Sequence, residues 1–206
     1  MTVARTILAL ALTAFGPTAL SAQSTDILLN CSACHAVAPE RPTTQVFPDL
    51  NGQPIRYLER QLEAFREGDR RHRQMELTAL ALGQGDGAMA RLYADAPRPV
   101  LEPKGMNDDT PPALVTQGDW SRGLAPCASC HSLDPDTDRA RTAPRLHGQP
   151  EAYLADQLRA YADGRRTSDP MGRMRAYSAR LDTAEISDLA AYYASWRPET
   201  EEAKND

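Results

Sequence analysis

The chain has 206 residues, which is enough for one medium domain or two small ones. Its formal net charge is −5, and this acidic balance argues against general nucleic-acid binding. Hydrophobic residues make up 41% of the chain but aromatic residues only 6%, so two small domains would each bury a modest core.

The first 22 residues have the pattern of a secretion signal. Arg5 is the only charged residue before Asp26, an apolar stretch spans residues 7–15, and small residues lead to Ala22. We predict cleavage after Ala22 and an exported mature chain; the alternative is an uncleaved membrane anchor. The apolar stretch is short for a span of about 20 residues, and we predict no membrane span in the mature chain.

The rest of the chain contains an internal repeat with an offset of 96 residues. Residues 50–65 match residues 146–161 through a shared Gly-Gln-Pro-x-x-Tyr-Leu-x-x-Gln-Leu segment, and the same offset relates Arg70 to Arg166. Coincident spacing over this length indicates a duplicated unit. With only two copies, it predicts a pair of globular domains rather than a solenoid.

Each unit is predicted to be helical. Ile55, Leu58, Leu62 and Phe65 recur at helical spacing, and Gly68 follows as a helix end. The second copy repeats the pattern at Leu154, Leu158 and Tyr161. No segment has the alternation expected of a strand, so we predict an all-α fold.

The segment 97–117 between the units contains five prolines and is predicted to be a semi-rigid linker. The predicted organisation is therefore a signal peptide (1–22), a first domain (23–96), this linker, a second domain (118–200) and an acidic tail (201–206).

The last predicted helix has clear signals at both ends. Asp182 can cap its start, and Glu185 three residues later completes a capping box. Pro198 ends it after Trp196. Its apolar face consists of Ile186, Leu189, Ala190 and Tyr193.

Residues 31–35 and 127–131 both have the form Cys-x-x-Cys-His, at equivalent places in the two units. Two thiols one helical turn apart can each form a thioether with a haem vinyl group, and the adjacent imidazole then ligates the iron. A haem in each unit would also supply apolar contact that the side chains lack. We therefore predict two covalently bound haem c groups, held by Cys31, Cys34, Cys127 and Cys130 and ligated by His35 and His131.

Three other interpretations of the cysteines are less consistent with the sequence. A zinc site would place the two cysteine pairs about 15–20 residues apart, whereas 92 residues separate Cys34 from Cys127. A thioredoxin-like redox pair would need a βαβ setting. Disulfides would leave His35 and His131 unexplained.

A methionine is the predicted second axial ligand at each iron, placed in a later loop. Met75 lies 40 residues after His35; Met171 lies 40 residues after His131, and Met174 lies 43 after it. Rigid spacing favours Met171. However, Met75 and Met174 each precede a leucine by seven residues, before the last helix of their unit, so a three-residue insertion would make them equivalent. We predict Met75 and Met174, with Met171 as the alternative.

Other candidate ligands have simpler explanations. Met89 shares a short predicted helix with Leu92 and is expected in the core. His72 lies in a run of arginines and is expected to face solvent, and His147 takes the place of Asn51, which is a poor ligand.

Further groups are expected around each haem. A proline carbonyl, from Pro48 or Pro144, is expected to accept the other N–H of each axial histidine. The candidates to hold the propionates are Tyr57, Tyr153, Gln53, Gln149 and nearby arginines. Arginines cluster at 66–73 and 165–175, for which we favour solvated helix ends; the alternative is a docking patch or contact with propionates.

These motifs resemble the dihaem cytochrome c4 family over about residues 26–196. The resemblance rests on both Cys-x-x-Cys-His motifs, Phe47-Pro48-x-Leu50, the repeated Gly-Gln-Pro segments, Met174-Arg175 and Leu181-x-x-x-Glu185-Ile186. It implies two class I cytochrome c domains related by a pseudo-twofold axis, with the propionate edges of the haems near each other. It also implies His/Met ligation, with Met75 and Met174 at the family's ligand positions.

The resemblance implies a periplasmic electron carrier that is not itself an enzyme. The predicted function is electron transfer between respiratory or dehydrogenase donors and a terminal oxidase or reductase. The redox partners are expected to dock weakly, and peripheral association with a membrane is left open. The alternative is a dedicated dihaem subunit of a periplasmic dehydrogenase, such as a flavocytochrome sulfide dehydrogenase. A dihaem enzyme would need an open iron, against which the methionines argue.

Overall fold

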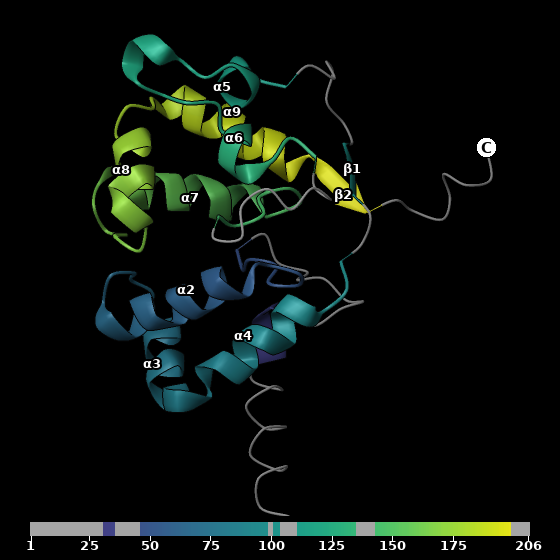
Figure 1. The fold of residues 1–206 in the computed structure, drawn as a ribbon, viewed down its shortest axis with the longest axis vertical. Coiled ribbons are helices and arrows are strands. Elements are labelled where there is room, and N and C mark those ends of the chain that lie inside the picture. The colour runs from purple at the N-terminus through teal and green to yellow at the C-terminus, as the bar shows by residue number, and fades with distance from the viewer. Residues whose placement is uncertain (1–30, 36–45, 99–100, 104–110, 135–142, 199–206) are drawn as a thin grey trace, which may run out of the picture.

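The computed structural model describes two helical halves, one from each copy of the repeat (Figure 1). The described residues are 31–35, 46–98, 101–103, 111–134 and 143–198. The predicted signal peptide and acidic tail lie outside these ranges, so their placement stays a prediction. The all-α fold predicted from the sequence is confirmed, apart from one short strand pair.

The first half is built around α2. After a helical segment at residues 31–35, its elements are α2 (Ile55–Glu67), α3 (Arg73–Leu82), the 3-10 turn η1 (Gly83–Gly85) and α4 (Asp86–Asp95). Helix α2 packs against both α3 and α4. It ends where Gly68 adopts the left-handed conformation, with φ of 85°, which a glycine accommodates without a side-chain clash.

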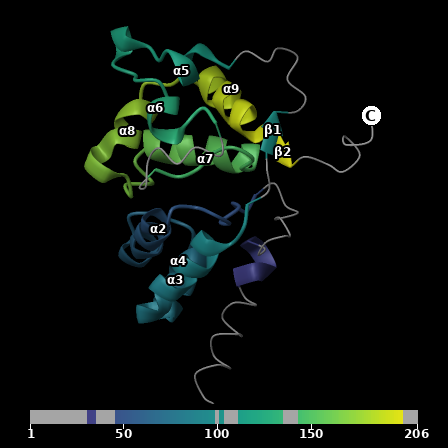
Figure 2. The same ribbon diagram turned by 45° about the vertical axis from the view of Figure 1, so that its right-hand side comes forward.

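The second half repeats this arrangement around α7. Its elements are α5 (Ala113–Thr116), η2 (Trp120–Arg122), α6 (Ala128–His131), α7 (Glu151–Ala162), η3 (Pro170–Gly172), α8 (Arg173–Ser178) and α9 (Thr183–Ala194). Helix α7 packs against α8 and α9, as α2 does against α3 and α4. Helices α2 and α7 face each other between the halves in both views (Figures 1 and 2).

The two halves have separate apolar cores. Tyr57, Leu58, Ala90 and Tyr93 form the first. The second contains Val115, Leu154, Ala155, Ile186, Leu189, Ala190, Tyr192, Tyr193 and Ala194. In both, the turn before the central helix is attached to the last helix by one backbone bond: Gly52 N–H donates to the Tyr93 carbonyl, and Gly148 N–H to the Tyr193 carbonyl, each at 2.8 Å.

The start of α9 confirms the predicted capping box. The Asp182 carboxylate accepts from the Glu185 N–H at 2.8 Å, and the Glu185 carboxylate accepts from the Asp182 N–H at 2.9 Å. Two of the orphan amide groups at the helix start are thereby satisfied.

The structure differs from the sequence analysis in the segment between the halves. Strand β1 (Leu101–Pro103) pairs antiparallel with β2 (Trp196–Pro198), where the sequence indicated no strand. Three residues are too few for alternation to be visible, and proline at the end of each strand supplies no N–H to extend the ladder. Residues 113–116, inside the predicted linker, form α5, and Val115 is fully buried in the second core.

In the described part of the chain, no helix has both the length and the apolar composition that a bilayer crossing requires.

Candidate functional site

A cavity of about 390 Å³ lies between the halves, and both Cys-x-x-Cys-His motifs contribute to its wall. From the first half the lining includes Cys31, Cys34, His35 and Met75; from the second it includes Cys127, His131 and Met174. Cys130 does not line the cavity. The wall between these groups is largely apolar, with Leu58, Phe65, Leu158 and Leu189 among its residues.

Each motif forms one turn of helix. Residues 31–35 are helical, and Cys127 is the residue that precedes α6. None of the four cysteines forms a disulfide with another described cysteine. Burial raises the pKa of the Cys31 thiol, with a further contribution from Cys34, and raises the pKa of Cys127 to about 11. These two sulfurs are therefore neutral at neutral pH and lie against an apolar cavity.

The two motif histidines are oriented identically. Nδ1 of His35 lies 2.9 Å from the Pro48 carbonyl oxygen, and Nδ1 of His131 lies 2.8 Å from that of Pro144. A carbonyl oxygen only accepts, so Nδ1 carries the proton and Nε2 keeps its lone pair free for a metal. Burial also lowers the pKa of both histidines, which favours the neutral form. The predicted proline carbonyls are confirmed as partners.

The candidate methionines lie on helices rather than in the loops predicted for them. Met75 is in the first turn of α3 and Met174 in the first turn of α8; both are half-buried and line the cavity. Met171, the alternative, is 85% exposed and does not line it.

An insertion explains why spacing alone favoured Met171. Met75 lies five residues after Arg70, whereas Met174 lies eight residues after the equivalent Arg166, a difference of three residues. The additional residues form η3, in which Met171 has a φ of 58°. Beyond this turn Met174 lies in the first turn of α8, as Met75 lies in the first turn of α3.

The three other residues considered as iron ligands occupy different positions relative to the cavity. Met89, expected in the core, is half-buried on α4 and lines the cavity. His72 is exposed, as expected, and lies at the edge of the cavity. His147 is buried against the rings of Tyr193 and Trp196, with centroid distances of 5.1 and 4.8 Å, and does not line the cavity.

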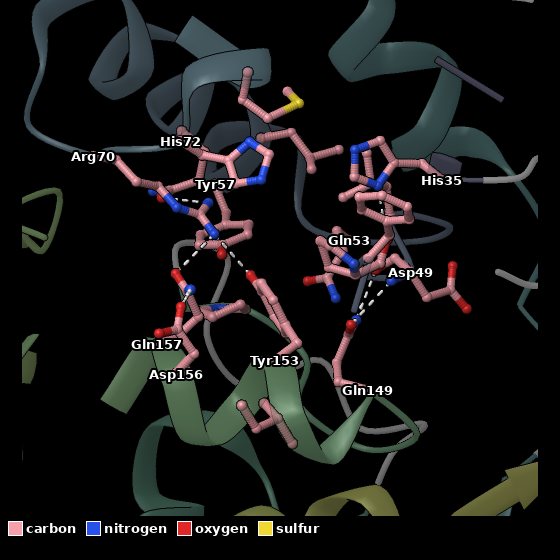
Figure 3. A pocket seen from close by; sticks show the side chains of 18 of the residues that line it. His35, Asp49, Gln53, Tyr57, Arg70, His72, Gln149, Tyr153, Asp156 and Gln157 are labelled. Carbon is pink, nitrogen blue, oxygen red and sulfur yellow. Dashed lines mark hydrogen bonds between the residues drawn. The ribbon is translucent and has the colours of Figure 1, made fainter. Parts of the chain in front are cut away.

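Two buried arginines meet between the halves. Arg70 and Arg166 are 8% and 4% exposed and form an isolated antiparallel bridge. Arg70 donates to Gln61 of its own half at 3.1 Å and to Tyr153 and Gln157 of the other, each at 2.9 Å (Figure 3).

Arg166 mirrors these bonds. It donates to Gln157 of its own half at 2.7 Å and, across the interface, to Gln61 at 2.6 Å and Tyr57 at 3.2 Å. The two arginines therefore share both glutamines, and each guanidinium stacks on an aromatic ring of its own half, Phe65 or Tyr161, at about 4.5 Å.

This arginine cluster has positive charge without a matching anion. Within the described residues, neither Arg70 nor Arg166 forms an ion pair with a carboxylate. Burial alone would raise the pKa of Tyr57, but Arg166 and Arg70 outweigh it and lower that pKa to about 8. Because an isolated buried charge is costly, two guanidiniums on the cavity wall suit a bound group with carboxylates.

The other arginines of the two clusters have different surroundings. Arg66, Arg165 and Arg175 pair with Asp86, Asp163 and Asp169 at 2.7–2.9 Å. Arg71, Arg73 and Arg173 are exposed. The favoured interpretation as solvated helix ends is therefore wrong for Arg70 and Arg166, which tertiary packing buries.

Two pairs of glutamines have roles that the sequence pattern did not predict. Gln61 and Gln157 connect the arginines, and Gln53 and Gln149, expected to contact propionates, instead bond to backbone of the opposite half. All four lie in the repeated segment, so the available signal was that these polar residues are duplicated. Gln61 and Gln157 lie within the central helices, and Gln53 and Gln149 lie in the turns before them.

Together these residues fit haem c. The site offers paired thiols, an imidazole with its Nε2 free, a thioether on the same cavity, apolar walls and guanidiniums for carboxylates. In each half the thiols and imidazole come from one motif, and the thioether comes from the helix after the central one.

Comparisons with known proteins agree with this assignment. The cytochrome c family model matches residues 124–196. Cytochrome c4 of Pseudomonas aeruginosa is 31% identical over 170 residues, which cover 79% of this chain and 81% of that protein. A thiosulfate dehydrogenase electron acceptor of Thiomonas intermedia is 29% identical over 170 residues, which cover 81% and 78% of the two chains. The structure of reduced cytochrome c4 from Pseudomonas stutzeri superposes with a TM-score of 0.69 at 26% identity, over 86% of this chain and 98% of that one.

Proposed function

Because the chain belongs to the cytochrome c4 family of dihaem electron-transfer cytochromes, we propose that it is a periplasmic carrier between respiratory or dehydrogenase donors and a terminal oxidase or reductase. As in its family, two haem c groups are covalently bound. Periplasmic location and the identity of the partners are parts of the proposal that rest on the export signal and on the family.

The residues that hold each haem are assigned half by half. Cys31 and Cys34 bind the first haem covalently, with His35 and Met75 as axial ligands. The corresponding set in the second half is Cys127, Cys130, His131 and Met174, in which Cys130 is assigned from its place in the Cys-x-x-Cys-His motif. The support is that His35, Met75, His131 and Met174 all line one cavity, whereas Met171 does not.

Side chains around the haems determine their properties. When bound, each haem supplies a one-electron couple between ferric and ferrous iron. A methionine thioether favours the ferrous state and raises the potential, and a second protein ligand leaves no position open for substrate. This ligation suits electron transfer without bond chemistry. Arg70 and Arg166 hold the propionates at the interface and offset their charge.

One observation carries the proposal: haem-binding residues of both sets, including all four proposed axial ligands, line one cavity shared by the two halves. An electron that enters one half therefore has a short route to the other through the protein interior. A single-haem carrier would not need the buried contacts between Arg70, Arg166, Tyr57 and Tyr153.

The carrier role can be tested by reoxidation. The holoprotein, chemically reduced, is mixed with membranes of the source organism, and the ferrous α-band is followed with time. We expect rapid, cyanide-sensitive and salt-sensitive reoxidation, because carriers dock weakly through charged surfaces. Reoxidation no faster than without membranes would contradict this role.

A second candidate is the dedicated electron acceptor of a dehydrogenase. The similarity to the Thiomonas intermedia thiosulfate dehydrogenase electron acceptor favours it. Under this alternative, thiosulfate and a thiosulfate dehydrogenase would reduce the holoprotein as fast as the dehydrogenase turns over, and the two would sediment as one stable complex. Slow reduction and separate sedimentation would exclude this second candidate.

A further inference from the structure

We infer that Gln149 positions the axial histidine of the first half and Gln53 that of the second, each acting across the interface through a single peptide group. The inference rests on the proposed haem ligation by His35 and His131. Beyond the binding of each haem, these two glutamines would set its reduction potential.

The peptide group between Pro48 and Asp49 connects the halves. Its carbonyl oxygen accepts from His35 Nδ1 at 2.9 Å, and its N–H donates to the Gln149 side-chain oxygen at 3.0 Å. The Gln149 amide nitrogen in turn donates to the Asp49 carbonyl at 2.7 Å. Figure 3 shows Gln149 reaching from the second half toward Asp49, beside His35.

The second half has the same connection in reverse. The carbonyl between Pro144 and Arg145 accepts from His131 Nδ1 at 2.8 Å, and the N–H of that peptide donates to the Gln53 side-chain oxygen at 2.9 Å. The Gln53 amide nitrogen donates to the Arg145 carbonyl at 2.9 Å. The repeat thus builds the contact twice, each time with a glutamine from the opposite half.

Burial makes these contacts strong and specific. Gln53 and Gln149 are each 5% exposed, so water competes little for their amide groups. Each carboxamide uses its oxygen and its nitrogen on the backbone of one residue, which fixes the plane of that backbone segment. The carbonyl that faces each histidine is therefore held by the other half.

Hydrogen-bond polarisation gives the contact a chemical consequence. An amide whose N–H donates to a strong acceptor has a more negative carbonyl oxygen, because successive hydrogen bonds polarise one another. A more negative carbonyl draws the Nδ1 proton of the histidine and makes the imidazole a more basic ligand. A more basic ligand stabilises ferric iron, so each glutamine lowers the potential of the haem in the opposite half.

The test compares the holoprotein with its Gln149→Leu and Gln53→Leu variants. Redox titrations are followed by NMR, with the haem methyl resonances of each half assigned separately. We expect Gln149→Leu to raise the potential of the first haem and to shift the His35 Nδ1 proton resonance, with a much smaller effect on the second haem. Gln53→Leu should do the reverse. Shifts confined to the variant's own half, or equal at both haems, would overturn the inference.

A matched control separates tuning from a loosened interface. Thr167 also bonds across the interface, from its N–H and hydroxyl to Asp69, but contacts no peptide that bears on a histidine. Thr167→Val should leave both potentials unchanged; a shift like that of Gln149→Leu would contradict the inference.

If Gln149→Leu does not fold, Gln149→Met keeps the unbranched side chain without the amide, and the same crossed shift is expected. The wild-type titration separates a failure of the proposed function from a failure of this inference. Fewer than two haems would defeat the proposed function, whereas two haems with potentials insensitive to either glutamine would defeat only this inference.

Discussion

Arg70 and Arg166 lie 96 positions apart in the sequence and pair with each other at the centre of the interface, each donating to the same two glutamines. The duplicated halves thus meet through equivalent residues. Their guanidiniums carry the positive charge on the wall of the shared cavity, and this charge should raise the reduction potentials of both haems.

Replacement of Arg166 should affect stability and potential together. Arg166→Leu removes one buried hydrogen bond to Tyr57 and one to Gln61, which we expect to cost about 1–3 kcal/mol in the free energy of unfolding. Loss of a cation beside the propionates should also lower the haem potentials, because the cation disfavours ferric iron. Arg166→Lys keeps the charge and should retain most of the potential; equal potentials in all three proteins would contradict this assignment. Denaturant unfolding and potentiometry measure the two effects.

The methionine assignment can be tested in the second half alone. Met174→Ala should abolish the sulfur-to-iron charge-transfer band of one haem and lower its potential, because the thioether stabilises ferrous iron. Met171→Gly should leave the band intact. It should also stabilise the fold by about 1 kcal/mol, since glycine adopts the left-handed conformation of Met171 without strain. Loss of the band in Met171→Gly instead would reverse the assignment.

Removal of the capping box should weaken α9 and, with it, the second core. We expect Asp182→Ala to reduce the free energy of unfolding by about 1 kcal/mol, because the Glu185 N–H at the helix start loses its partner. Asp182→Asn, which keeps an acceptor, is the control. Thermal unfolding of the holoprotein monitors both, and equal losses in the two variants would rule out the cap as the cause.

His147 should make stability depend on pH. Burial lowers its pKa to about 4, below the ordinary value of 6.5, so the unfolded chain binds a proton more readily than the folded one. Its contribution is present above pH 6.5 and is lost as the pH falls toward 4, by an amount on the order of 3 kcal/mol. His147→Asn introduces the residue that the first half has at the equivalent position, Asn51, and should remove this dependence of stability on pH. Denaturant unfolding between pH 4 and 7 measures it, and parallel curves would contradict the prediction.

The features of the fold and the site that could be predicted from the sequence were those that the spacing of nearby residues defines. Residues within a few turns of each other define the central helices, the cap at Asp182 and both Cys-x-x-Cys-His motifs. The repeat is visible because these local patterns recur at a constant offset of 96 residues. The Met174 assignment needed one further step, the insertion that the structure places in η3.

The contacts between the halves could not be predicted in the same way. Spacing within one copy does not reveal which face meets the other copy, so buried Arg70 was mistaken for a solvated residue and Gln149 for a propionate ligand. The pairing of β1 with β2 joins segments about 95 residues apart through three residues each, which leaves no periodic signal.

The central claim is that each half binds its own haem through its own pair of cysteines. Intact mass spectrometry of the mature holoprotein, made in a host with haem-attachment machinery, tests it alongside the Cys31→Ala/Cys34→Ala and Cys127→Ala/Cys130→Ala variants. We expect two haem masses on the wild type and one on each variant. A wild type with fewer than two haems, or a variant that keeps both, would contradict the claim.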